Sequence, residues 1–212
     1  MELLYTVITA DVVDSRHQNA ILEEKRKYVR VISSPDLVAP FTFSRGDEIQ
    51  GLCSGTFSSP ALLRHLRYIC RPLELRIGIG IGRVTSGLEA KSSWEMNGPA
   101  FYRARQALDQ VKKERHSLTK LVSGDSNFDQ LLNALLTLYD TIQSKWTPAQ
   151  WEGVMTYEEQ GTYKKAADQL GVAFQNVEKR CRAANWLALK QAEEAIKSAV
   201  LNLVDINLLL GE

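Results

Sequence analysis

The sequence predicts an α+β domain followed by a small all-helical domain. Residues 1–124 alternate strand-like runs with helical spacing in the order βαββαβαβ, which is typical of a sheet with helices packed on it. Beyond Gly124, every periodic segment has helical spacing only. The short turn-rich segment SGDSN at 123–127 separates the two patterns, so we expect domains at 1–124 and 125–212.

The first half of the α+β region predicts a strand, a helix and a hairpin. Residues 2–13 contain LLYTVITADVV, which is β-branched and apolar on both faces, as in a buried central strand. Apolar residues at helical spacing then predict a helix within 15–33. Two strand-like runs within 41–53 flank the turn RGDE at 45–48, which indicates a hairpin.

The second half predicts two more helices and two more strands. A serine cap followed by Pro60 starts a helix that runs to Cys70. The remaining elements are a strand over 73–84, a helix over 98–113 and a short strand at 118–122. In the strand LELRIGIGIGRV the glycines share one face, which predicts close approach of a helix, a ligand or a second chain. A closely packed helix is the commonest of the three explanations.

The helical region predicts a long first helix, three short helices and a last helix. The first covers 128–144, the three short ones lie within 147–186, and the last covers 187–210. The last helix has an apolar stripe, and an isolated helix with such a stripe needs a partner. We expect it to fold back on its own domain rather than form a dimer seam.

Composition excludes several classes of protein. The chain is 44% hydrophobic and 24% charged with a net charge of +1, which fits a soluble globular protein and not a disordered one. Its apolar runs are too short to span a bilayer, and no secretory signal is visible, so we expect no membrane partner. The three scattered cysteines predict buried thiols in the cytoplasm rather than disulfides or zinc ligands.

Charge is distributed unevenly along the chain. Residues 1–120 hold 18 Lys and Arg against 13 Asp and Glu, a net charge of +5, whereas residues 148–198 hold 7 of each sign. The excess favours a phosphate-bearing ligand in the first domain, although a solvated surface explains it equally well.

Two aspartates are candidate metal ligands. Asp11 ends the buried strand, and Asp47 lies at the tip of a hairpin that could pair beside it. A pair of carboxylates needs a compensating cation, and Mg²⁺ or Mn²⁺ held by two carboxylates and substrate phosphates is one recurring solution. Gly46 would let the hairpin backbone approach a phosphate. In the alternative interpretation, Asp11 caps a turn and Asp47 is an exposed turn residue.

Four segments together resemble class III nucleotidyl cyclase domains. TADVVDS, SRGDEIQGLC, LRIGIGIGRV and NGPAFYRARQAL occur in that family's order and approximate spacing, across residues 3–122. The sequence looks most similar to the SatD-like bacterial proteins, which join such a region to a helix-turn-helix. The resemblance implies a ferredoxin-like or cyclase-like sheet and a head-to-tail homodimer.

The resemblance also implies roles for individual residues. Asp11 and Asp47 would be the metal ligands, and Val12, Val13 and Gly46 would face the nucleotide. The departures argue against an enzyme: Tyr102 and Gln106 occupy the slots of the family's transition-state Asn and Arg. Glutamine cannot supply the charge of a guanidinium, which is worth orders of magnitude in phosphoryl transfer.

The spacing of Ala167, Gly171 and Val177 is typical of a helix-turn-helix. A small residue allows two helices to cross, glycine makes the turn and a branched residue secures the second helix. The segment 147–186 resembles the helix-turn-helix regions of sigma-factor region 4 and LuxR-type proteins. The outward residues of its last helix are candidates for DNA contact: Gln175, Asn176, Lys179, Arg180 and Arg182.

The sequence therefore favours a cytoplasmic DNA-binding regulator. Its cyclase-like domain would bind a nucleotide with Mg²⁺ or Mn²⁺, or would only mediate dimerisation. The alternative is a Mg²⁺- or Mn²⁺-dependent nucleotidyl cyclase-type enzyme acting on a nucleoside triphosphate. A third interpretation is an adaptor protein in which neither site is used, with the helical region making protein–protein contacts or only packing on the first domain.

Overall fold

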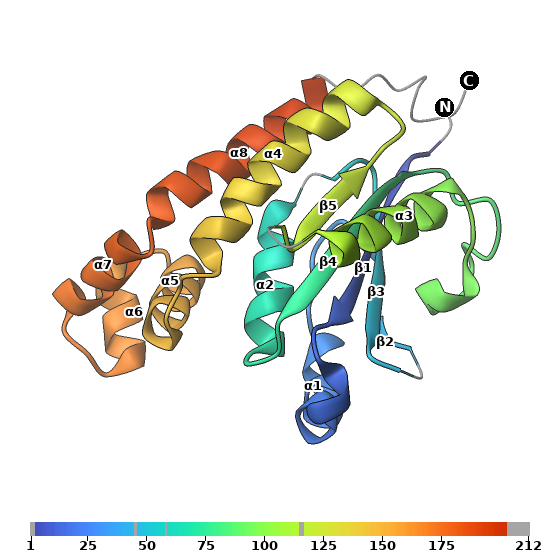
Figure 1. Cartoon of the computed structure of the whole chain (residues 1–212). Helices are drawn as coiled ribbons and strands as arrows, with labels where there is room; N and C mark the ends of the chain where they lie inside the picture. Colours follow the sequence, from blue (N-terminus) through green and yellow to red (C-terminus); the bar gives the residue numbers. More distant parts are fainter. Residues whose placement is uncertain (1–2, 45, 58, 115–116, 203–212) are drawn as a thin grey trace. The chain divides into compact units, whose positions relative to one another are not determined.

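The computed structural model describes residues 3–44, 46–57, 59–114 and 117–202. Over these residues the chain is α+β, with a five-stranded mixed sheet and eight α-helices (Figure 1). The strands are β1 (Tyr5–Val12), β2 (Leu37–Phe43), β3 (Glu48–Ser54), β4 (Leu75–Gly82) and β5 (Thr119–Val122). The first helices are α1 (Asn19–Val29), α2 (Pro60–Cys70), α3 (Pro99–Lys113) and α4 (Ser126–Gln143). They are followed by α5 (Pro148–Gln160), α6 (Tyr163–Leu170), α7 (Phe174–Ala183) and α8 (Trp186–Asn202).

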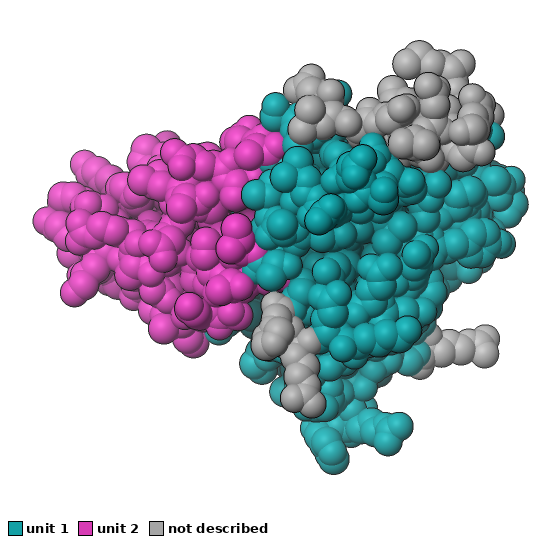
Figure 2. All heavy atoms as spheres, turned by 45° about the horizontal axis from the view of Figure 1, so that its top comes forward, with its two compact units in different colours: residues 1–137, 196–212 teal, residues 138–195 magenta. Residues whose placement is uncertain are grey.

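The chain forms two compact units (Figure 2). Unit 1 contains residues 1–137 and 196–212, and unit 2 contains residues 138–195. Both α4 and α8 contribute residues to each unit. The expected division after residue 124 stays a prediction, because these units are defined by contacts and not by independent folding.

The sheet of unit 1 has the strand order β2-β3-β1-β4-β5. The central strand β1 pairs antiparallel with β3 and β4, β2 pairs antiparallel with β3, and β5 pairs parallel with β4. The order of elements through residue 122 is the predicted βαββαβαβ. Strand β1 is a central strand, as predicted, because it pairs with a strand on each side and seven of its eight residues are buried.

The glycines of β4 face a helix, which is the commonest of the three expected explanations. Helix α3 crosses this face of the sheet and packs on β4, β1 and β5. A methyl group on Gly78 would come within 2.3 Å of the Ala104 carbonyl oxygen, and one on Gly80 within 2.1 Å of the Ala100 carbonyl oxygen. Only glycine allows the two backbones to approach this closely.

The opposite face of the sheet holds the larger apolar core. Side chains of α1, α2, the first part of α4 and the last part of α8 pack there against β1 and β4. The contributions of α8 are Ile196 and Val200. This part of the predicted stripe packs in the core of the α+β region together with α4, and not only on the helical domain as we expected. Leu187, expected on the same stripe, is 68% exposed instead. The rest of the predicted helix, including Leu203, Val204 and residues 208–210, lies outside the described residues.

Two element boundaries differ from the sequence prediction. The helix expected within 15–33 begins only at Asn19, after a 3₁₀ turn at Ser15–His17, because Gln18 between them has a non-helical backbone with φ of −126° and ψ of 19°. Strand β2 begins at Leu37 although Pro40 lies within it. Pro40 is exposed and β2 is an edge strand, the position in which a sheet tolerates proline.

Two predictions from composition can be compared with the structure. All three cysteines are buried and unbridged, as predicted, and burial raises the pKa of the Cys53 and Cys70 thiols to about 12. Over the described residues, no helix combines the length and apolar character that crossing a bilayer requires.

Candidate functional site

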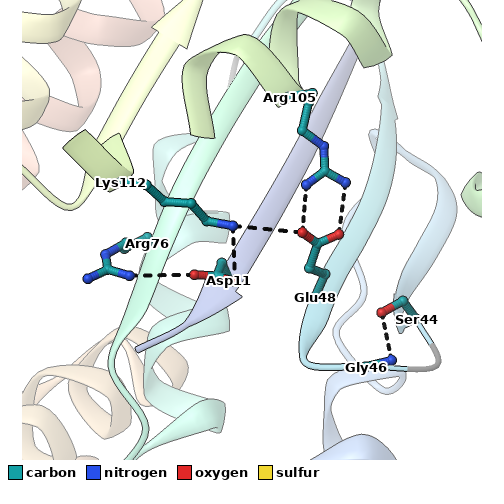
Figure 3. Close-up of polar contacts among 7 residues, drawn as sticks. All are labelled: Asp11, Ser44, Gly46, Glu48, Arg76, Arg105 and Lys112. Carbon is teal, nitrogen blue, oxygen red and sulfur yellow. Dashed lines mark hydrogen bonds and ion pairs between the residues drawn. The ribbon is translucent and has the colours of Figure 1, made fainter. Parts of the chain in front are cut away.

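A row of charged residues lies at the edge of the sheet where β1 ends and the antiparallel strands β3 and β4 begin. Asp11 on β1 stands directly opposite Glu48 on β3 and Arg76 on β4. Directly opposed residues of antiparallel strands point to the same face, here the face that α3 covers. The sheet register therefore brings two carboxylates and one guanidinium together (Figure 3).

Helix α3 adds two more cations to this row. Arg105 and Lys112 are seven residues apart, so they lie on the same side of the helix two turns apart. Arg105 donates to both carboxylate oxygens of Glu48, with the Nη2–Oε2 distance 2.8 Å. Lys112 Nζ lies 3.2 Å from Asp11 Oδ1 and 3.8 Å from Glu48 Oε1, between the two carboxylates (Figure 3). Arg76 Nη1 completes the cluster at 3.6 Å from Asp11 Oδ2.

The electrostatics of the row follow from these contacts. The hydrogen bonds from Arg105 lower the pKa of Glu48 against the opposing effect of its partial burial. The same hydrogen bonds raise the pKa of Arg105. Asp11 has 13% of its side chain exposed, and both of its oxygens face a cation of the protein itself. Cations of the chain itself therefore pair with both carboxylates of the row.

Asp47 has different surroundings from Asp11. It borders an open hollow of about 580 Å³ together with residues of α1 and the preceding turn, and Asp11 is not among the residues that line it. Arg26 of α1 holds the hairpin here, donating to the carbonyl oxygens of Ser44 at 2.9 Å and Gly46 at 2.7 Å. The hollow carries both signs of charge, since Arg16 and Glu23 also line it.

The backbone groups expected to face phosphates are engaged within the protein. The Val13 amide donates to the Glu74 carbonyl at 3.0 Å, and the Val12 side chain is buried in the apolar core. The Gly46 amide donates to Ser44 Oγ at 3.1 Å (Figure 3). A methyl group on Gly46 would meet nothing closer than 3.7 Å, so no close approach requires glycine at this position.

A divalent cation at Asp11 does not fit the residues as they stand. Mg²⁺ and Mn²⁺ take oxygen ligands, and the oxygens of Asp11 face Lys112 and Arg76. Among the described residues, no group of three or more His, Cys, Asp or Glu side chains is placed to hold a metal ion. Tyr102 and Gln106, in the slots of the cyclase transition-state residues, are both exposed on α3.

Unit 2 contains a three-helix arrangement in which α5, α6 and α7 each pack on the other two. The first helix starts with a capping box, in which Thr147 and Gln150 each accept a hydrogen bond from the other's backbone amide. Two glycines with left-handed backbones, Gly161 and Gly171, end α5 and α6. The inward residues are fully or nearly fully buried: Val154, Ala166, Ala167, Val177 and Cys181.

The outward face of α7 is polar. Gln175, Asn176 and Lys179 are exposed, and the Arg182 side chain is 75% exposed with an ion pair to Glu178 at 3.8 Å. The spacing i, i+1, i+4 and i+7 places these four residues on one side of the helix, opposite Val177 and Cys181.

Arg180 differs from the other candidate DNA contacts. Its guanidinium lies 3.1 Å from Glu152 on α5, and only 25% of its side chain is exposed. Its aliphatic part packs over Gly153, where a methyl group would come within 3.0 Å of the Arg180 Cβ. Arg180 therefore joins α7 to α5.

Sequence reasoning missed Glu48, Arg76, Arg105 and Lys112 as partners of Asp11. The sequence did contain a signal for Arg76. This residue lies two positions before Gly78, so the two-residue period of a strand places it on the same face as the glycines of β4. The seven-residue spacing of Arg105 and Lys112 was also visible. Their meeting with Asp11 depends on the register between strands, which the sequence alone does not specify.

The chain is therefore an α+β protein with two polar surfaces, the charged row under α3 and the outward face of α7. A model of the SatD family matches residues 5–197, so the chain belongs to the SatD family. A search of curated proteins finds no match. One similar solved structure is the regulator of polyketide synthase expression from Bifidobacterium adolescentis, with 13% identity and a TM-score of 0.28. The alignment covers 94% of this chain and 79% of that chain, and its low TM-score supports no argument about fold or function.

Proposed function

We propose that this SatD-family chain is a DNA-binding regulatory protein that reads duplex DNA with α7. The observation that carries the proposal is the exposed polar face of this helix. Gln175, Asn176, Lys179 and Arg182 share that face, while the residues behind it are buried against α5 and α6. A helix presented in this way can enter the major groove.

The geometry around α6 and α7 favours a helix-turn-helix. Ala167 is buried where the helices meet, Gly171 makes the left-handed turn with φ of 65°, and Val177 is fully buried on α7. These are the three roles that the motif requires of these positions. Fold is not function, however, so the proposal depends on the chemistry of the outward side chains.

The four outward residues match the chemistry of base edges and phosphates. Gln175 and Asn176 lie in the first turn of α7, where amide side chains can pair with adenine N6 and N7. Lys179 and Arg182 lie further along and suit guanine or phosphate. We assign Arg180 a different role, holding α7 against α5 through Glu152.

Charge sets an expectation for affinity. Since residues 148–198 carry no net charge, non-specific binding to DNA should be modest and the preference for a specific site should depend on base contacts. A homodimer would add affinity by placing two α7 helices on half-sites about 34 Å apart. We propose that unit 1 supports such a dimer, and its strand order is consistent with the ferredoxin-like sheet of cyclase domains.

The experiment is a selection of duplexes by the full chain from a random-sequence pool, followed by affinity measurements. Lys179→Glu combined with Arg182→Glu should abolish binding to the selected duplex. The matched control, Lys113→Glu combined with Lys197→Glu, makes the same charge change at exposed sites outside α7 and should bind nearly as well as the wild type. Retained binding by the α7 variant would move the contact surface elsewhere.

A second candidate function is binding of a phosphate-bearing small molecule in unit 1. The hollow beside Asp47 favours it, since it holds about 580 Å³ and is lined by Arg16 and Arg26. Thermal unfolding with ATP and GTP tests it, because ligand at 100 times its dissociation constant adds about 2.7 kcal/mol of stability. A shift that Arg16→Ala removes would support the candidate, and no shift with either nucleotide would reject it.

A further inference from the structure

The charged row of unit 1 contains more cations than carboxylates. Asp11 and Glu48 face three cations of the same chain, Arg76, Arg105 and Lys112. Each carboxylate has a cation of its own, Arg76 for Asp11 and Arg105 for Glu48. Lys112 is the additional charge.

The place of Lys112 explains why an additional charge is present. Strand register sets Asp11 and Glu48 directly opposite one another, and opposed like charges on neighbouring strands destabilise a sheet. The ammonium group of Lys112 lies 3.2 Å from one carboxylate and 3.8 Å from the other, so it attracts both and offsets their repulsion (Figure 3). A divalent cation shared by the two carboxylates would serve the same electrostatic purpose.

We infer that Lys112 is a built-in counter-ion, which bridges Asp11 and Glu48 where a divalent cation would otherwise be needed. The Asp11–Glu48 pair then needs no metal ion to offset its repulsion. Unlike a free ion, the ammonium group of Lys112 belongs to α3, so its two contacts also hold the last turn of this helix over β1 and β3. The side chain of Lys112 is 33% exposed, so the bridge is accessible to competing ions and can be tested directly.

The first test asks whether the carboxylates bind a metal in the wild-type protein. Mn²⁺ is titrated into the full chain, and bound Mn²⁺ is followed by its electron spin resonance signal, in the wild type and in Asp11→Asn. We expect the two proteins to bind Mn²⁺ equally weakly. Binding by the wild type that Asp11→Asn removes would overturn the inference, whether or not other variants fold.

The second test asks whether Lys112 and Asp11 act on each other. Lys112→Met, Asp11→Asn and their combination are unfolded in urea, with Lys113→Met as the control for a neighbouring exposed lysine. We expect the double variant to unfold at nearly the same urea concentration as the less stable single variant, since either single change already removes the Asp11–Lys112 contact. Strictly additive shifts would overturn the inference.

The third test is a gain of binding. Removing Lys112 leaves Asp11 and Glu48 facing one another, so Lys112→Met should bind Mn²⁺ more tightly than the wild type by at least tenfold. The additional change Asp11→Asn should abolish the gain. A folded Lys112→Met protein that binds Mn²⁺ no better than Lys113→Met would overturn the assignment of Lys112 as the counter-ion.

Discussion

Substituting alanine for Gly80 should be among the most destabilising single changes in unit 1. The added methyl group would lie 2.1 Å from the Ala100 carbonyl oxygen and 2.2 Å from the Ala104 amide nitrogen, whereas ordinary contacts are 3.4–4 Å. Both neighbours are backbone atoms, so no side chain can rotate away and α3 must move outward by more than about 1 Å.

The magnitude follows from two opposing effects. Overpacking of a core costs about 1–3 kcal/mol, and a clash with helix backbone belongs at the upper end of that range. Replacing glycine by alanine restricts the unfolded chain and returns about 0.4–1 kcal/mol. We therefore expect Gly80→Ala to lower the free energy of unfolding by at least about 2 kcal/mol.

Urea denaturation followed by circular dichroism measures this loss. Gly46→Ala is the matched control, since its added methyl group meets nothing closer than 3.7 Å, and it should change stability by less than about 0.5 kcal/mol. Equal stabilities for Gly80→Ala and the control would refute the close packing of α3 on β4.

Three further predictions concern single contacts. Because Arg105 lowers the pKa of Glu48, this carboxylate stabilises the fold fully above its unfolded-state pKa, and the contribution is lost as pH falls through the lower folded-state value. Glu48→Gln should therefore flatten the acid limb of thermal stability below about pH 5, and an unchanged limb would contradict this. Trp146 donates a buried hydrogen bond to the Ala184 carbonyl at 2.7 Å, so Trp146→Phe should cost about 1–3 kcal/mol in urea denaturation, and no loss would argue against the bond. Burial raises the pKa of the Cys181 thiol to about 11, so alkylation located by mass spectrometry should be far slower in the native protein than in urea, and equal rates would disprove its burial.

Local patterns predicted the elements of the fold well. The alternation in 73–84 identified β4, and the glycines on its one face correctly anticipated a helix, because period-two geometry puts them on a single surface. Capping residues such as Thr147 and turn glycines such as Gly171 also act locally, so the starts and ends of α5 and α6 were readable from the sequence.

Contacts between segments far apart in the chain were harder to predict from the sequence. Asp11 was readable as a charged residue at the end of a buried strand, but its partners Arg76 and Lys112 lie 65 and 101 positions away in the sequence. Their contacts depend on strand register and on where α3 crosses the sheet. On α7 the reverse holds, since helical periodicity alone separates exposed Gln175 and Lys179 from buried Val177.

The most direct test of the proposed function is a competition titration of the full chain between the selected duplex and a scrambled duplex at equal salt concentration. Reading of bases by Gln175 and Asn176 predicts a preference on the order of 10³ or more for the selected duplex. Gln175→Ala combined with Asn176→Ala should lose most of that preference while retaining the weak non-specific binding. Equal affinity of the wild-type chain for the two duplexes would contradict the proposal that α7 reads DNA.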